Sequence, residues 1–218
     1  MSPAASSPQA RPEALSAVLS ACLEAMREAS DDAAVLGCLA RVEAGLAGAT
    51  GTIAPEPQST PTGAYLAAAL AQARDGGGAL VALADGLLAL DASLTWRMRG
   101  GADPAPEDLP GRIANAMVIG PGGLEARRDV WLGVSLLPPG AAYPEHSHAP
   151  EEVYLFLTPG RARHGDAPWQ ETSPGSMMHN TPHITHALEA APDAPMLAVW
   201  VLHDPRHDTP HDPGDAAG

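Results

Sequence analysis

Residues 143–160, YPEHSHAPEEVYLFLTPG, gather two histidines, three carboxylates and two tyrosines beside a run of β-forming residues. Alternate residues of an extended chain face the same side, and His146, His148, Glu152 and Tyr154 all have the same parity. Imidazole and carboxylate groups suit Zn, Fe, Mn, Ni or Co, and two histidines with one carboxylate leave coordination positions open for a substrate. The stretch therefore predicts a site for one divalent transition metal.

A fourth metal ligand is expected from the histidines further along the chain. His186 is the first candidate, because it lies in the β-type run ITHAL, which follows a turn containing Gly and Pro. His183 competes with it, since Thr-Pro-His places that histidine at the turn itself. An isolated His-x-His pair is more often a pair of surface residues on a strand. Here the nearby glutamate, the apolar strand and the second histidine cluster favour the metal interpretation.

The charge of the chain limits its partners. Twelve basic against 26 acidic residues give a formal charge of -14, which argues against nucleic acid and anionic membrane surfaces. The charge is compatible with a small cationic or zwitterionic substrate, and it is equally a solubility feature. All twelve basic residues are arginine, which excludes Schiff-base catalysis by lysine and the lysine of a P-loop.

The cysteines and the apolar pattern indicate a reducing compartment. Cys22 and Cys38 lie in alanine-rich helical sequence, far from any histidine, and are expected to be buried free thiols. The N-terminus lacks the apolar segment of a signal peptide, and no window approaches 18 uninterrupted apolar residues. We therefore expect a cytoplasmic protein that does not span a membrane.

The first half of the chain has a helical texture. Residues 1–12 are a Pro/Ser/Ala tail that is expected to be disordered. Residues 13–111 form a helical N-terminal region, in which apolar residues recur every three or four positions. The helical segments are predicted at 13–48, 63–74 and 79–93, and LTWRMRG at 94–100 is expected to end them. We expect this region to be a packing layer on the second half, or to mediate a homodimer.

The second half has the texture of β-structure. Short β-branched or aromatic runs between 112 and 203 are punctuated by Gly, Pro and Asp, which predicts an antiparallel β-sandwich or barrel. The predicted strands lie at 117–120, 129–137, 152–157, 176–179, 184–188 and 195–202. Residues 204–218 are expected to form a second disordered tail. The predicted fold class is α+β, with a helical N-terminal region packed on a C-terminal β-barrel that spans 112–203.

The histidine stretch resembles the first motif of the cupin superfamily, G-x5-H-x-H-x3-E-x6-G. It runs from Gly140 to Gly160 with one extra residue before the last glycine. The second cupin motif, G-x5-P-x-G-x2-H-x3-N, is matched loosely by GSMMHNTPHITH at 175–186, without the glycine after proline and without the final asparagine. The resemblance implies a small jelly-roll-like barrel with a metal in its mouth. The ligands that it implies are His146, His148, Glu152 and His186.

Three aromatic residues restrict the resemblance to one group within the cupin superfamily. Tyr143 lies three residues before the first predicted ligand, Tyr154 lies two residues after the glutamate, and Trp200 lies on the expected last strand. With the helical N-terminal region, this pattern resembles the cupin-type dimethylsulfoniopropionate lyases. The resemblance implies a carbon–sulfur lyase that removes the proton next to the substrate carboxylate, releases dimethyl sulfide and leaves acrylate.

The same resemblance implies roles for these aromatic residues. A free tyrosine has a pKa of about 10, but a neighbouring cation favours the phenolate. Tyr154 is the first candidate for the base, and Tyr143 either replaces it or orients the substrate carboxylate. The sulfonium group would suit an aromatic face. The substrate-binding candidates are Trp200, Trp131 and His183, with Trp169 as a further aromatic and with His179 and His183 as hydrogen-bond donors around the site.

Two other functions fit the same residues. One is a non-haem iron dioxygenase that acts on a small thiol or phenolic substrate, and oxygen consumption would reveal it because the elimination is redox-neutral. The other is a metal-containing cupin that only binds a small ligand. The tyrosines that flank the ligands speak against this second alternative, since a binding module has no need of phenols beside the metal.

Overall fold

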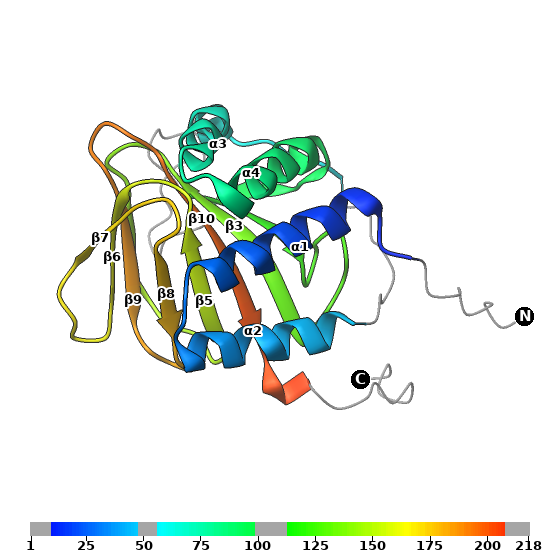
Figure 1. Ribbon diagram of the computed structural model, residues 1–218. Helices are drawn as coiled ribbons and strands as arrows, with labels where there is room; N and C mark the ends of the chain where they lie inside the picture. Colours follow the sequence, from blue (N-terminus) through cyan, green and yellow to red (C-terminus); the bar gives the residue numbers. More distant parts are fainter. Residues whose placement is uncertain (1–9, 48–55, 99–112, 208–218) are drawn as a thin grey trace, which may run out of the picture.

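The structure is a computed structural model that describes residues 10–47, 56–98 and 113–207 (Figure 1). Most of the two predicted tails, 1–12 and 204–218, lies outside the described residues. Within the described ranges, none of the helices is long and apolar enough to cross a membrane.

Helices form the first half of the chain, as the apolar periodicity predicts. The α-helices are α1 (Glu13–Glu28), α2 (Ala33–Leu46), α3 (Leu66–Arg74) and α4 (Gly78–Leu90). Short 3-10 helices are η1 (Pro61–Tyr65), η2 (Asp91–Ser93) and η3 (Pro205–His207). The carboxylate of Asp32 caps α2, because it accepts hydrogen bonds from the backbone N–H groups of Ala34 and Val35.

The second half forms two antiparallel sheets. The first sheet has the order β1-β2-β3-β10-β5-β8, and the second has the order β4-β9-β6-β7. The strands of the first sheet are β1 (Trp96–Met98), β2 (Ala114–Ile119), β3 (Val130–Leu137), β10 (Met196–His203), β5 (Glu151–Phe156) and β8 (Met177–Asn180). Those of the second are β4 (Ala142–His146), β9 (His186–Ala190), β6 (Gly160–His164) and β7 (Gln170–Thr172). The predicted α+β class is confirmed.

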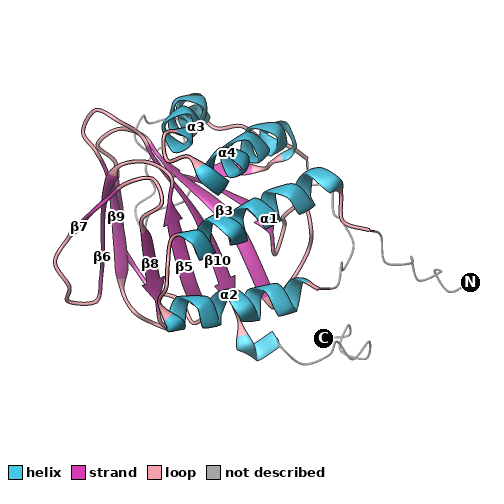
Figure 2. Cartoon of the chain, viewed as in Figure 1, coloured by secondary structure: helices cyan, strands magenta, loops and turns pink. Residues whose placement is uncertain are grey.

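The six-stranded sheet separates two apolar cores. Its outer face is covered by the helices, and α2 contacts β3, β5 and β10 (Figure 2). Alternation along each strand decides which residues enter which core. On β5, Val153 and Leu155 pack with the helices, whereas Tyr154 and Phe156 join a second core with residues of the four-stranded sheet. The helical half is therefore a packing layer, and the second core lies between the two sheets.

Four strands were not predicted from the sequence. LTWRMRG was expected to end the helical region, but its centre forms β1, and Trp96 pairs with Ala116 of β2. β4 contains a proline, β6 reads GRARH, and β7 is three residues long, so none of them has an apolar alternating pattern. These strands are held by pairing with their neighbours, which the residue types alone do not indicate.

Candidate metal centre

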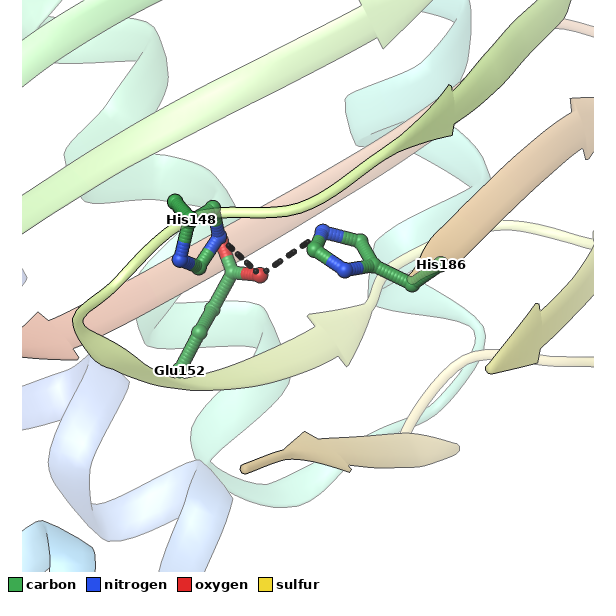
Figure 3. Close-up of side chains that lie close together, drawn as sticks. All are labelled: His148, Glu152 and His186. Carbon is green, nitrogen blue, oxygen red and sulfur yellow. Dashed lines mark hydrogen bonds and ion pairs between the residues drawn. The ribbon is translucent and has the colours of Figure 1, made fainter. Parts of the chain in front are cut away.

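Three side chains of the predicted metal site converge between the two sheets (Figure 3). His148 lies in the turn after β4, Glu152 is the second residue of β5, and His186 is the first residue of β9. Their ligand atoms lie within 4.8 Å of one another. Among the described residues, these are the only three His, Cys, Asp or Glu side chains that come so close together. We call them the His–Glu–His cluster.

The imidazole rings at the site are oriented by backbone carbonyl groups two residues away in the chain. The Nδ1 atoms of His146, His148 and His186 lie 2.9, 2.9 and 3.1 Å from the carbonyl oxygens of Pro144, Pro150 and Ile184, respectively. A carbonyl oxygen can only accept, so Nδ1 carries the proton and Nε2 carries a lone pair in the neutral ring. Each ring is therefore in the tautomer that binds a metal through Nε2.

The charge of the cluster is set by one buried carboxylate. Glu152 is 3% exposed, and its Oε2 lies 3.1 Å from Nε2 of His148 and 3.2 Å from Nε2 of His186. Burial alone would raise the pKa of this carboxyl, but the neighbouring imidazoles of His148 and His186 outweigh burial and lower the pKa to about 2. The carboxylate is thus ionised and accepts only. Because a nitrogen with a lone pair cannot donate to it, the cluster requires either protons on Nε2 or a cation.

A divalent transition metal fits these residues. Nε2 of His186 is buried and makes no hydrogen bond within the described part of the chain, which is costly unless another partner satisfies the atom. One cation would satisfy this nitrogen and neutralise the carboxylate at the same time. Two imidazoles and one carboxylate are donors that several divalent transition metals accept.

His146, the remaining predicted ligand, lies beside the cluster but outside the group of three. It ends β4 and pairs with His186 across β4 and β9, next to a register irregularity. Its ring centroid lies 4.1 Å from that of His186 and 6.4 Å from that of His148. The structure places His146 next to the predicted site, and its role as a ligand stays a prediction.

The two candidate bases contact different imidazoles. Tyr154, 2% exposed, faces the edge of His186 with ring centroids 5.9 Å apart. Tyr143, 3% exposed, stacks on His146 with centroids 4.1 Å apart and ring planes 7° from parallel. Both tyrosines line the cavity beside the cluster. Neither contact assigns the base, so both roles stay predictions.

A cavity of about 460 Å³ adjoins the cluster and has the size of a small-molecule site. Trp131 and Trp200, two predicted substrate-binding residues, form part of its wall. Trp200 donates from Nε1 to Oγ of Ser135 at 3.0 Å, and its ring lies against Gly133, where a Cβ would stand 2.2 Å from the ring. Glycine at 133 therefore makes room for the indole. The other cavity-lining residues beyond those of the site are Thr95, Arg97, Asn115, Met117, Pro121, Gly122 and Leu202.

Three other candidates lie away from this wall. His183 is exposed on the turn before β9 at φ 65°, and its backbone N–H donates to the carbonyl of His148 at 2.8 Å. Trp169 lies against two arginine guanidinium groups of β6. His179 hydrogen-bonds Glu151 at 2.8 Å, and both belong to neighbouring strands at the edge of the first sheet. The predicted roles of these residues at the substrate remain untested.

Several polar residues near the site were not predicted. Asn180 of β8 donates from Nδ2 to Oε2 of Glu152 at 3.1 Å, whereas the predicted strand ended at 179. Extending the alternation by one residue would have placed Asn180 on the interior face with Met178. Arg97 and Asn115, which are opposite each other on β1 and β2, line the cavity. No pattern in the sequence indicates that these two strands reach the site.

A family model and curated proteins match the chain. The model that describes dimethylsulfoniopropionate (DMSP) lyase matches residues 15–198. DddL of Cereibacter sphaeroides, assigned by name as a DMSP lyase, is 28% identical over 144 residues, which are 66% of this chain and 60% of that protein. The DMSP lyase DddQ of Ruegeria pomeroyi is 30% identical over 124 residues, which are 56% of this chain and 60% of that protein. The matches thus span less than two thirds of the length of these curated relatives.

Solved structures share the architecture. The crystal structure of the DMSP lyase DddQ from Ruegeria pomeroyi superposes with a TM-score of 0.65 at 19% identity, and covers 95% of this chain and 100% of that chain. A structure from a study of the DMSP lyases RdDddP and RnDddQII gives 0.63 at 19% identity, with 88% and 93% covered. At such identities the likeness concerns the fold. It confirms the predicted architecture, in which a helical region packs on antiparallel β-structure.

Proposed function

The chain belongs to the dimethylsulfoniopropionate lyase family, and on this premise we propose that it cleaves DMSP by β-elimination to dimethyl sulfide and acrylate. The proposed cofactor is one divalent transition metal, Fe, Zn, Mn, Ni or Co, held by the His–Glu–His cluster with His146 as a fourth ligand. The donor set accepts several of these metals, so the ligands do not choose among them.

One observation carries the metal-dependent part of this proposal. Two imidazoles, both with Nδ1 committed to a carbonyl, direct Nε2 at the same buried carboxylate oxygen. A purely structural contact would place one proton between one histidine and the glutamate, whereas here two Nε2 atoms face one oxygen, and the buried Nε2 of His186 makes no hydrogen bond within the described part of the chain. One bound cation would satisfy the buried Nε2 of His186 and would also neutralise the carboxylate of Glu152.

The chemistry of the elimination is divided between the metal and the phenols. When bound, a divalent cation would supply Lewis-acid stabilisation of the negative charge that develops on the substrate carboxylate, and would favour ionisation of a nearby phenol. Tyr154, on the same strand face as Glu152, is the proposed base that takes the proton from the carbon next to the carboxylate. The electrons of that C–H bond form the double bond of acrylate, and the C–S pair departs with dimethyl sulfide. Tyr143 is the alternative base, or it orients the carboxylate.

The aromatic wall is proposed to hold the sulfonium end of the substrate. An indole or phenol face attracts a cation within about 6 Å of the ring centroid. Trp200 is held in place by Ser135 and Gly133, and Trp131 is fixed by a hydrogen bond from its Nε1 to the carbonyl of Arg128 at 3.1 Å. Both therefore offer rings with limited freedom to a substrate in the cavity.

The test is release of dimethyl sulfide into the headspace. Purified chain is stripped with a chelator and reloaded separately with Fe(II), Mn(II), Co(II), Ni(II) or Zn(II), then given DMSP. We expect dimethyl sulfide and acrylate in equal amounts with at least one metal and none in the stripped protein. No release with any metal would remove the substrate assignment. Oxygen uptake with Fe(II) and no dimethyl sulfide would instead indicate a dioxygenase.

The cytoplasmic location and the homodimer predicted from the sequence stay predictions.

A further inference from the structure

Asn180 is the third neighbour of the carboxylate oxygen at the centre of the cluster. It lies directly opposite Glu152 in the pairing of β8 with β5. It is 0% exposed, and its Nδ2 donates to Oε2 of Glu152 at 3.1 Å. We propose that Asn180 is a positioning residue that holds Glu152 in the orientation that binds the cation. The inference rests on the proposed metal site but not on the identity of the substrate.

The hydrogen bond from Asn180 differs in kind from the contacts with the two imidazoles. Nε2 of His148 or His186 can donate to Glu152 only when the ring is protonated, and it cannot donate while it binds a cation. An amide N–H donates at every pH, and it does so with or without a cation. Among the described residues, Asn180 is therefore the one side-chain donor seen at Oε2 that persists once both histidines bind the metal.

Because its hydrogen bond to Glu152 persists when a metal is bound, Asn180 can keep the carboxylate in place. The carboxylate of Glu152 must present an oxygen between two histidines that belong to a turn and to the other sheet. A donor fixed on the neighbouring strand orders the carboxylate before the cation arrives, so less freedom is lost on binding. Removing partners that orient metal ligands typically costs about 10–100-fold in metal affinity.

The unpaired oxygen of Asn180 indicates that packing alone does not favour this side chain. Its Oδ1 is buried and makes no hydrogen bond with any described residue. A buried amide oxygen without a partner is destabilising, and asparagine is disfavoured in strands. A leucine of similar shape would avoid both penalties. The contact with Glu152 therefore accounts for an asparagine that packing alone would not favour.

The experiment compares Asn180→Leu with a matched control, Thr172→Val. Thr172 of β7 is also buried, its Oγ1 also has no hydrogen-bond partner among the described residues, and it does not line the metal-site cavity. The affinity of the wild-type chain and of each variant for Zn(II) and Mn(II) is measured by chelator competition, together with the melting temperature of the metal-free form and the visible spectrum of the Co(II)-loaded form.

We expect Asn180→Leu to weaken the affinity for Zn(II) and Mn(II) about 10–100-fold. It should also change the Co(II) spectrum, while the melting temperature of the metal-free form measures the cost of leaving the buried carboxylate of Glu152 without this donor. Thr172→Val should keep the wild-type affinity and spectrum. Unchanged affinity in Asn180→Leu, or an equal loss in Thr172→Val, would overturn the inference. So would a lower melting temperature of Asn180→Leu with an unaltered Co(II) spectrum, because that result assigns the residue to packing.

A second variant covers the case in which Asn180→Leu does not fold. Asn180→Ser keeps a polar side chain but withdraws the donor from Glu152, so it must show the same loss of affinity. A wild-type protein that binds none of these metals would overturn the proposed metal site and this inference with it. Metal binding without release of dimethyl sulfide would overturn only the proposed substrate.

Discussion

The two faces of the six-stranded sheet have different roles, although both are formed by alternating residues of the same strands. Val153 and Leu155 of β5 pack under the helices, while Glu152 and Tyr154 face the cavity between the sheets. On β5 the helix face carries the apolar Val153 and Leu155, and the interior face carries Glu152 and two aromatic residues. Stability and chemistry are thus divided by the alternation of the strand, so a substitution should affect mainly one of them.

The adjacent glutamates Glu151 and Glu152 show this division most directly. Glu151 forms an ion pair with Arg41 of α2 and a hydrogen bond with His179, so it ties β5 to the helical layer and to β8. Glu152 faces the other way, toward the His–Glu–His cluster. The residue type is the same, and the partners decide whether the carboxylate holds elements together or is available to a cation.

The largest expected effect comes from Glu152→Gln. The amide is nearly isosteric but has lost the negative charge, so we expect metal content and release of dimethyl sulfide to fall to the level of the stripped protein. Elemental analysis and the headspace assay measure both. The matched change Glu151→Gln should retain the metal and the activity. Equal loss in both variants would show that the two faces are not independent.

Tyr154→Phe should have the next largest effect. Removing a general base typically lowers the rate about 10²–10⁴-fold, and the phenyl ring preserves the packing. We therefore expect kcat to fall by that factor with metal content unchanged, while Tyr143→Phe reduces it less. Steady-state headspace kinetics decide between them. If Tyr143→Phe shows the larger decrease, the base is Tyr143.

Leu155→Ala tests the opposite face of the same strand. Leu155 is fully buried against the helical layer, and truncating such a leucine typically costs about 2–5 kcal/mol of unfolding free energy. We expect this loss in urea denaturation, with kcat per folded molecule close to that of the wild type. A fall in kcat comparable to that of Tyr154→Phe would contradict the separation of stability and chemistry between the two faces of the sheet.

The smallest expected effect concerns pH and the loop that leads into β3. Burial would raise the pKa of Asp129, but hydrogen bonds and charge from Arg127, 2.7 Å away, lower it below its ordinary value. A lowered folded pKa means that Asp129 stabilises the fold above its unfolded pKa of about 3.9, and that this contribution is lost as pH falls through the folded pKa. Asp129→Asn should therefore be less stable than wild type at pH 7, with the difference shrinking toward pH 2. Urea midpoints at several pH values measure this, and a difference independent of pH would contradict it.

Much of the fold follows from local patterns in the sequence. The period of three and four in α1 and α2, the cap at Asp32 and the apolar runs of β3, β5 and β10 each identify an element without reference to the rest. β1, β4, β6 and β7 could not be identified in this way. Arginine, histidine or proline occupies positions in several of them, and their extended form depends on pairing with strands that are distant in sequence.

The residues of the candidate site also differ in whether local sequence is enough to predict them. His148 and Glu152 have the same parity, and the Ala-Pro pair between them can form a turn, so the sequence predicts that they meet. The position of His186 depends on which later strand returns to the site, and local sequence does not determine this. Asn180 and Arg97 depend on the register of β8 and on the position of β1, which only the sheet topology determines. Contacts within a short segment were predictable, and contacts set by strand order were not.

Glu152 and His186 belong to different sheets, so an ion held by both would make the stability of the fold depend on the metal supply. A bound ion would cross-link the sheets, and a ligand that binds only the native state at a hundred times its Kd adds about 2.7 kcal/mol of stability. A chain made during metal shortage would then unfold more often and be degraded sooner than a loaded one. The amount of folded protein would then follow the available metal.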